Sequence, residues 1–585
     1  MCEESLKDAL RFVQPMKTVS NKSLSNPLKI VLVFSALFIL SGLIIVRRWL
    51  PVNTLVAYFD DGLFLSRAEF ILSGQLGEIN WGFNALVKGT FYPWFIVFGN
   101  KINLNPVFLS YLVLVLVILF LGTIVYSFTK NFLISLGLIL FLAADPLYFS
   151  EGSSRLMREF IQQNLVLLFF VLFNAIFYFI ARSKSPSILA LPLTILSGIV
   201  LAVSINVREE NIWIYSAYFL NIIILFFSRK FEIKHLVFVN IILIITLFIS
   251  IQVVRTINSH FYEVNLQNST TEGEFPKMML NLSSIATSQG NVRYSTIDKN
   301  KREIAYRISP SFAQLQPYLE GPGQAWVQFG CQDTNTCDDY SNGWFHVALR
   351  EAIRNIGWWE TEKIAQEKMG QINNEISKAC EDKVIECRKG IAFGPAYGNQ
   401  FISYQEVSDS FPFFSQYVKS SLNNWGIKRE VNESTIYKTE IMPEDLYTSW
   451  KKTVPSMPAG QNQYLDKYNS RYLMLQPFLN YWSSIYSIFL TILLIVNLLI
   501  PFLLIFYKFR VKLNIFLMST YIIFLYLWVS RGIFLSLNSS VNFKSVGLTY
   551  ALSGRVFLSS FLFLGLIIFF SILKQKLKSW EQHPM

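Results

Sequence analysis

Two adjacent aspartates, Asp60 and Asp61, follow the first long apolar run of the chain. Neighbouring carboxylates close to lipid are costly to desolvate and need a partner, such as a cation, a metal ion or a substrate hydroxyl. In a chemical role, one of them can accept the proton of a hydroxyl group that attacks an electrophile. A solvated turn or a helix cap would explain the same pair without any chemistry.

Arginines and further acids occupy short polar segments between the apolar runs. Guanidinium groups match phosphate oxygens in a bidentate way, so these segments can form a pocket for an anionic lipid headgroup if they lie on one face. Salt bridges among the segments are the alternative explanation. The residues concerned are Lys88, Tyr92, Arg155, Arg158, Glu159, Arg208, Glu209 and Glu210, together with Arg555 before the last apolar run.

The elements that must position these residues are membrane helices. Of the 585 residues, 52% are hydrophobic and only 15% are charged, which is far too apolar for a soluble enzyme of this length. A bilayer core of about 30 Å requires about 20 apolar residues per helix. About ten runs approach this length, at Ile30–Val46, Pro106–Phe128, Asn131–Ala144, Leu165–Ala181, Ile188–Ile205, Ile212–Phe227, Leu236–Val254, Tyr481–Tyr507, Ile515–Ser530 and Val556–Leu573.

The runs predict a mainly α-helical, polytopic membrane protein with three regions. Residues 1–254 form an N-terminal membrane region of about seven helices, residues 255–476 a mainly helical external domain, and residues 477–585 a C-terminal membrane region of about three helices. Lysine and arginine resist translocation, and a cytoplasmic N-terminus makes every predicted inner loop basic. We therefore expect both termini in the cytoplasm. The net charge of +12 then reflects topology rather than a nucleic-acid partner.

Four of the five cysteines, Cys331, Cys337, Cys380 and Cys387, lie in the predicted external domain. An even number in an oxidising compartment predicts two disulfides, for which sequence allows three pairings; a zinc site is the alternative. A helix that continued through Cys387 would hold the Cα atoms of the last two cysteines about 10 Å apart, beyond disulfide reach. Either that helix stops near Glu381, or the bridges are crossed. One face of the helix is marked by Ala365, Met369, Ile372, Ile376 and Ala379.

The polar segments resemble those of the GT-C superfamily of membrane glycosyltransferases, which includes the protein mannosyltransferases and the aminoarabinose transferases. The resemblance covers the helices and short loops of the two membrane regions, and not residues 255–476. Valine follows Arg555 where the family often has tyrosine. The likeness rests on Asp60-Asp61, Lys88, Tyr92-Pro93, Arg155, Arg158-Glu159, Arg208-Glu209-Glu210 and Gly554-Arg555-Val556.

The resemblance implies transfer of a sugar from a polyprenyl-phosphate donor to a glycan, lipid or protein acceptor on the external face, with inversion at the anomeric carbon. An aspartate of the first loop would be the general base; Asp60 is preferred, and Asp61 is left to orient the loop or bind a metal. A divalent metal ion is used by some members and not by others. Candidates to stabilise the departing phosphate are Lys88, Arg155, Arg158, Arg208 and Arg555, with Tyr92, Glu159, Glu209 and Glu210 as further site residues.

Other classes of membrane protein compete with this interpretation. A lipid or saccharide transporter or flippase would also place charges in membrane clefts, although transporters favour the bilayer midplane and related halves. A non-catalytic protein with an external binding domain is a further alternative. If the chain is an enzyme of the resembling kind, the expected location is a bacterial inner membrane with the active site on its periplasmic side.

The basic inner loops generate a topological prediction. Reporter fusions after Lys230 and within the predicted external domain near Gly390 should report opposite sides of the membrane. A result that places both reporters on the same side would contradict the topology and, with it, the external site.

Overall fold

The structure is a computed structural model. It describes residues 26–52, 60–74, 86–150, 152–182, 190–228, 230, 232–288, 294–388, 392–393, 400–401, 404–422, 448, 451–454, 461–506, 514–542 and 552–582.

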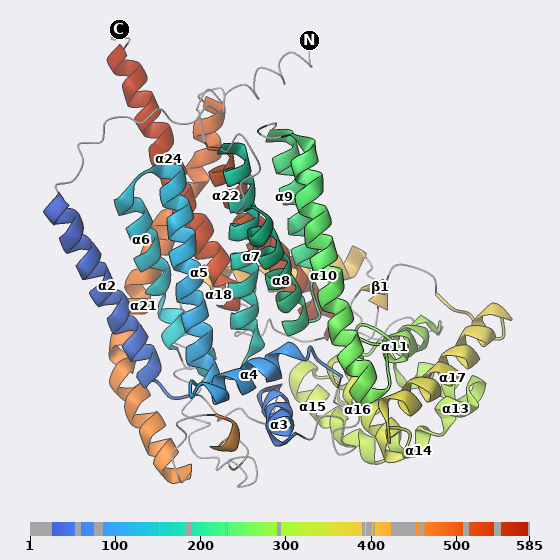
Figure 1. Cartoon of the computed structure of the whole chain (residues 1–585). Helices are drawn as coiled ribbons and strands as arrows, with labels where there is room; N and C mark the ends of the chain where they lie inside the picture. Colours follow the sequence, from blue (N-terminus) through green and yellow to red (C-terminus); the bar gives the residue numbers. More distant parts are fainter. Residues whose placement is uncertain are drawn as a thin grey trace, which may run out of the picture.

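A bundle of long apolar helices forms the larger part of the molecule (Figure 1). Within the described residues, nine helices are long and apolar enough to cross a membrane, and α9 is a shorter apolar helix. Each predicted run falls largely on one of these helices, which confirms the mainly α-helical, polytopic class. They are α2 (Asn26–Trp49), α5 (Pro106–Thr129), α6 (Phe132–Ala143), α7 (Arg158–Arg182), α8 (Ala190–Val207), α9 (Ile212–Ser228), α10 (Ile233–Tyr262), α21 (Gln461–Phe506), α22 (Ile515–Asn542) and α24 (Arg555–Gln582).

The bundle is organised around α7. This helix is buried along almost its whole length, from Arg158 to Ile180, and it contacts α5, α8, α22 and α24. In contrast, only 11% of the apolar window of α2 and of α10 is buried. A helix that is apolar all round is stable at the perimeter only where lipid covers it. The central helix can therefore hold polar residues in fixed positions, while α2 and α10 face the bilayer.

Short helices gather at one end of the bundle, which we call the domain side. They are α3 (Asp60–Ser73), α4 (Phe91–Lys101), η2 (Pro146–Phe149) and η3 (Gly152–Ser154). The inserted domain, defined as α11 to α17 with the short strands that follow, lies at the same end, whereas α24 ends on the opposite side (Figure 1).

The inserted domain has a hydrophobic core of its own. The apolar face predicted for residues 365–379 is buried in that core, since Ala365, Met369, Ile372 and Ile376 are fully covered. The elements are α11 (Glu274–Ser284), α12 (Lys299–Ile308), α13 (Pro310–Ala313), α14 (Gln316–Leu319), η4 (Pro322–Gln324), α15 (Ala325–Thr334), α16 (Asn342–Asn355), α17 (Glu362–Glu381), β1 (Ala392–Phe393) and β2 (Gln400–Phe401).

Two features show how this domain joins the bundle. Helix α10 continues to Tyr262, past residue 254, so the membrane helix runs directly into the domain. Helix α18 (Tyr404–Leu422) leaves the domain and packs against α22, where the Tyr417 hydroxyl donates to the carbonyl of Trp528 at 3.0 Å. The segment 255–476 is therefore not one compact body, because part of it lies along a membrane helix.

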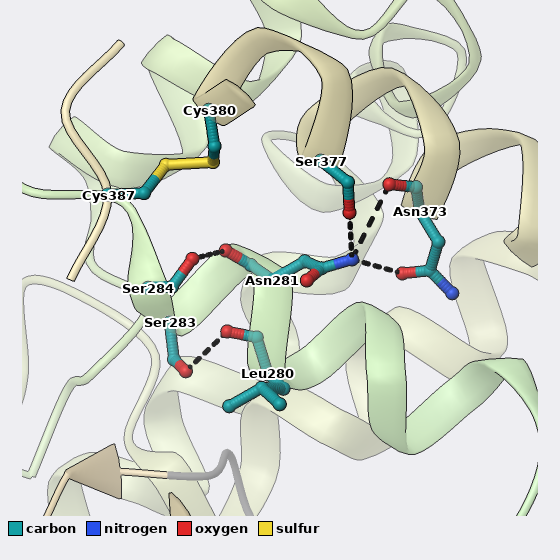
Figure 2. Close-up of a disulfide and its surroundings, with 8 residues drawn as sticks. All are labelled: Leu280, Asn281, Ser283, Ser284, Asn373, Ser377, Cys380 and Cys387. Carbon is teal, nitrogen blue, oxygen red and sulfur yellow. Dashed lines mark hydrogen bonds between the residues drawn. A yellow bond between two sulfur atoms is a disulfide. The ribbon is translucent and has the colours of Figure 1, made fainter. Parts of the chain in front are cut away.

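The four predicted disulfide cysteines form two bridges, Cys331–Cys337 and Cys380–Cys387. Helix α17 ends at Glu381, which is the first of the two alternatives left open by the sequence. Figure 2 shows the second bridge beside the contact between α11 and α17, where the Asn281 amide donates to Asn373 Oδ1 at 2.9 Å. The bridge ties the end of α17 to Cys387, whose backbone pairs with Ile285 directly after α11.

Peptide mapping should find both bridges in protein purified without reductant. Loop-entropy arguments assign about 2 kcal/mol of stability to a bridge that closes so short a loop. We therefore expect Cys380→Ser combined with Cys387→Ser to lower the free energy of unfolding by about that amount. Crossed pairs, or free thiols at these positions, would contradict the assignment.

Candidate functional site

Asp61 is the first predicted site residue that the structure locates with its partners. Its side chain is fully buried, and both oxygens accept hydrogen bonds from Arg155, at 3.1 Å from Nε and 3.3 Å from Nη2. Asp61 lies in the first turn of α3, while Arg155 lies in the segment that leads into α7. The pair therefore joins the first and second polar segments. The side chain of Asp60 lies outside the described residues.

A second group of charges joins the start of α7 to the turn between α8 and α9. Arg158 binds Glu209 with two hydrogen bonds, at 2.5 Å from Nη1 and 2.9 Å from Nη2. Arg208 binds Glu159 at 2.5 Å and also contacts Glu210. All five side chains are at most 11% exposed. Such burial of ions is tolerated because each charge has a counter-charge at hydrogen-bond distance.

The electrostatic effect of these pairs is clear for Glu209, which lies between two membrane helices. Burial alone would raise the pKa of its carboxyl group, but the Arg158 guanidinium outweighs burial, and the pKa is lowered. Lys88 and Arg208 add to the lowering. Lys88 therefore belongs to the same electrostatic environment as the arginines.

Tyr92 on α4 is buried next to this group, with its ring 5.0 Å from that of Phe64 in an edge-to-face arrangement. Burial raises the pKa of its phenol well above the ordinary value, and the Asp61 and Glu159 charges raise it further. The phenol therefore keeps its proton and can act as a hydrogen-bond donor.

The loop that carries Lys88 is held by close backbone packing. A Cβ atom at Gly89 would lie only 2.0 Å from the carbonyl oxygen of Asn206, so no other residue fits without a shift of the backbone. On the other side, the amide of Ser269 donates to the carbonyl of Leu86 at 2.7 Å. The loop is thus held between the end of α8 and the segment that joins α10 to α11.

Arg555 belongs to a separate pair. Its Nε is 2.9 Å from Asp145 Oδ2, and its guanidinium lies over the Tyr486 ring at 5.0 Å. Arg555 begins α24 and Asp145 follows α6, so this pair ties the last membrane helix to the second polar segment.

Sequence reasoning missed a further buried arginine, Arg531 on α22. Its side chain is 1% exposed, its Nη2 donates to Ser553 at 2.7 Å, and its guanidinium lies 5.3 Å from the Trp213 ring centre. Electrostatic coupling to Glu159 and Arg208 places it near the second group of charges. The sequence does contain a signal for it, because Arg531 directly follows an apolar run, and an arginine beside such a run commonly pairs with another group or binds a ligand.

An apolar groove of about 470 Å³ opens beside these charges. It is lined by side chains of α3, α4, α8 and α10, among them Phe70, Trp94, Ala202 and Val253. Arg67 is the charged residue in the lining, and its Nη1 donates to the carbonyl of Lys88 at 3.2 Å. Because α10 is a perimeter helix, the groove lies where bilayer lipid can reach it.

The described residues do not provide a metal site. Among them, no three histidine, cysteine, aspartate or glutamate side chains are grouped in a way that could hold a metal ion. The acids of the predicted site are instead engaged by guanidinium groups, as the pairs of Asp61 and Glu209 illustrate. A divalent metal therefore has no ligand set in the described part of the chain.

Comparison with known proteins finds no matching family model, no matching curated protein and no matching solved structure. The function of the chain is therefore inferred from its charged pairs and its apolar groove.

The pair of Arg158 and Glu209 can be tested by removing its negative partner. Glu209→Gln leaves a buried guanidinium without its carboxylate, and such a loss costs about 3–5 kcal/mol of unfolding free energy. Glu232→Gln is the matched control, because Glu232 pairs with Lys234 at an exposed site and its loss should leave the free energy of unfolding almost unchanged. Denaturant titrations in detergent would measure both. Equal effects would contradict a structural role for the buried pair.

The same pair predicts a pH dependence. The pKa of Glu209 is lower in the folded protein than in the unfolded chain, whose value is about 4.3. Its contribution to stability is therefore complete above that pH and is lost as pH falls through the folded pKa. Glu209→Gln should remove this component of the acid-induced loss of stability.

Proposed function

We propose that this chain is a membrane glycosyltransferase of the GT-C type, which transfers a sugar from a polyprenyl-phosphate donor to an acceptor hydroxyl. The observation that carries the proposal is the joining of two polar segments by the ion pair between Arg155 and the fully buried Asp61, next to the arginines of the third segment. Burying so many charges at one end of a membrane bundle is costly. Binding of a substrate that carries a phosphate and a reacting hydroxyl group would explain why so many charges are buried there.

The chemistry follows from the residue types. The acceptor hydroxyl attacks the anomeric carbon of the donor, the bond from that carbon to the phosphate oxygen breaks, and the hydroxyl proton passes to an aspartate of the first segment. Asp60 is assigned as this base. The ion pair with Arg155 supports a positioning role for Asp61. Attack opposite the departing phosphate inverts the anomeric configuration.

The departing lipid phosphate carries the charge that the cations would stabilise. Arg155, Arg158 and Arg208 each bind a carboxylate. A phosphate would bind by sharing those guanidinium groups, since each has five N–H donors and the carboxylates use only some of them. Such preorganised donors lower the barrier when charge develops on the leaving group.

The apolar groove supports a lipid-linked donor rather than a soluble one. Its length along α10 and its mainly apolar lining suit a polyprenyl chain, while Arg67 and the neighbouring Lys88 loop suit the phosphate at the chain's end. A soluble sugar nucleotide would have no use for such a groove. The proposal includes a cytoplasmic position for both termini and a periplasmic position for the site in a bacterial inner membrane.

Substitution of the first-segment aspartates tests the proposal. Asp60→Asn should lower turnover by about 10²- to 10⁴-fold and leave donor binding unchanged, because asparagine preserves shape but cannot accept the proton. Asp61→Asn should lower turnover, donor binding and thermal stability together, because Arg155 loses its counter-charge. Purified protein would be assayed with a panel of polyprenyl-phosphate sugars.

Near-normal turnover in both variants would exclude the first segment as the catalytic centre. A protein that binds these lipids and moves them across vesicles without sugar transfer would support the transporter alternative. Binding without either activity would support a non-catalytic binding protein.

A further inference from the structure

A polar cleft of about 410 Å³ lies on the inserted domain, separate from the charged groups at the membrane. It is formed by α12, α14 and η4, together with Asp338, which directly follows the Cys331–Cys337 bridge. Its volume falls within the range of small-molecule sites, about 300–1,000 Å³. None of its lining side chains is aliphatic; they are carboxylates, amides, cations and the tyrosine ring of Tyr306.

The floor of the cleft is a fixed hydrogen-bond network. Arg302 is 1% exposed, and it donates from Nε to Glu320 at 2.9 Å and from Nη1 to Asp339 at 2.7 Å. The Tyr306 hydroxyl donates to the same Glu320 oxygen that accepts from Arg302, at 2.8 Å. The guanidinium also lies 5.0 Å from the Tyr340 ring centre. These contacts hold polar groups in place before any ligand arrives, which reduces the entropic cost of binding.

The lining chemistry selects the kind of ligand. Apolar ligands are disfavoured because the cleft offers them almost no apolar surface. Phosphates and acidic sugars are disfavoured because three carboxylates line the cleft against two cations, and one of those cations, Arg302, is bound by two carboxylates. A metal ion lacks a ligand set among the described residues.

Once apolar ligands, anions and metal ions are set aside, neutral molecules rich in hydroxyl groups suit the lining of the cleft. A hydroxyl group both donates and accepts, so it can satisfy the carboxylates of Glu303 and Glu320 and the amide groups of Gln316 and Gln324 at once. The Tyr306 ring, which stacks on Phe312 with 5.1 Å between the ring centres, also lines the cleft and gives a sugar ring an apolar surface to contact.

We propose that this cleft binds a neutral saccharide. The site is distinct from the proposed catalytic centre and does not require that the chain be a transferase. If both proposals hold, the cleft is a second saccharide site that can retain an acceptor glycan near the membrane.

Ligand-observed NMR on the full-length protein in detergent tests the inference. The probes are neutral mono- to tetrasaccharides of glucose, galactose, mannose and N-acetylglucosamine at millimolar concentration. At least one should bind, and Gln316→Ala or Glu303→Gln should weaken its binding about tenfold. Both side chains are exposed, so the domain core is untouched. The matched control is Gln328→Ala, on an exposed position of α15 outside the cleft, which should leave binding unchanged.

Several outcomes would overturn the inference: no binding by any of these saccharides, preferential binding of a phosphorylated sugar or a basic peptide, or equal loss in all three variants. Loss on Phe329→Ala with normal binding by the cleft variants would place the site instead on the aromatic cluster formed by Trp344 and the exposed Phe329. Asp60→Asn should retain binding, so a failure of the transferase proposal remains distinguishable from a failure of this one.

Discussion

Buried arginine–carboxylate pairs are the constraint on which the domain side of this protein depends. An ion removed from water loses several kcal/mol of hydration free energy, and only a counter-charge with good hydrogen-bond geometry recovers it. Arg155 with Asp61, and Arg158 with Glu209, meet this condition between segments far apart in the sequence. The pairs therefore determine how the loops between membrane helices lie against one another.

The central helix α7 makes this arrangement possible. It begins with the charged residues Arg158 and Glu159, continues through the polar run 162–164, and then becomes an apolar helix that is buried along most of its length. Because its contacts with neighbouring helices leave little freedom, its first turn presents both charges in fixed directions. The perimeter helix α10 does the opposite, since it leaves a groove against α4 and α8 that bilayer lipid can enter. A rigid charged site thus lies beside an accessible apolar one.

The inserted domain is linked to the same site through Ser269, in the segment between α10 and α11. Ser269 accepts a hydrogen bond from the buried Arg350, whose guanidinium also lies 3.8 Å from the Phe275 ring centre. Burial lowers the pKa of Arg350 to about 10, which still leaves it charged at neutral pH. The amide of Ser269 in turn holds the loop of Lys88 through Leu86. A continuous series of hydrogen bonds therefore links the core of the inserted domain to the loop that carries Lys88.

The sequence by itself determined the membrane class, the apolar runs and the charged segments, because these depend on local composition and on helical periodicity. It also limited the cysteine pairing to alternatives, of which the end of α17 at Glu381 selected one. Only the tertiary structure decided which arginine binds which carboxylate, that Arg531 lies beside Trp213, and that α18 packs against α22. Those contacts join residues on separate segments, such as Arg158 and Glu209, which are 51 positions apart, and Tyr417 and Trp528, which are 111 apart. Concave surfaces such as the groove and the cleft exist only once helices have packed.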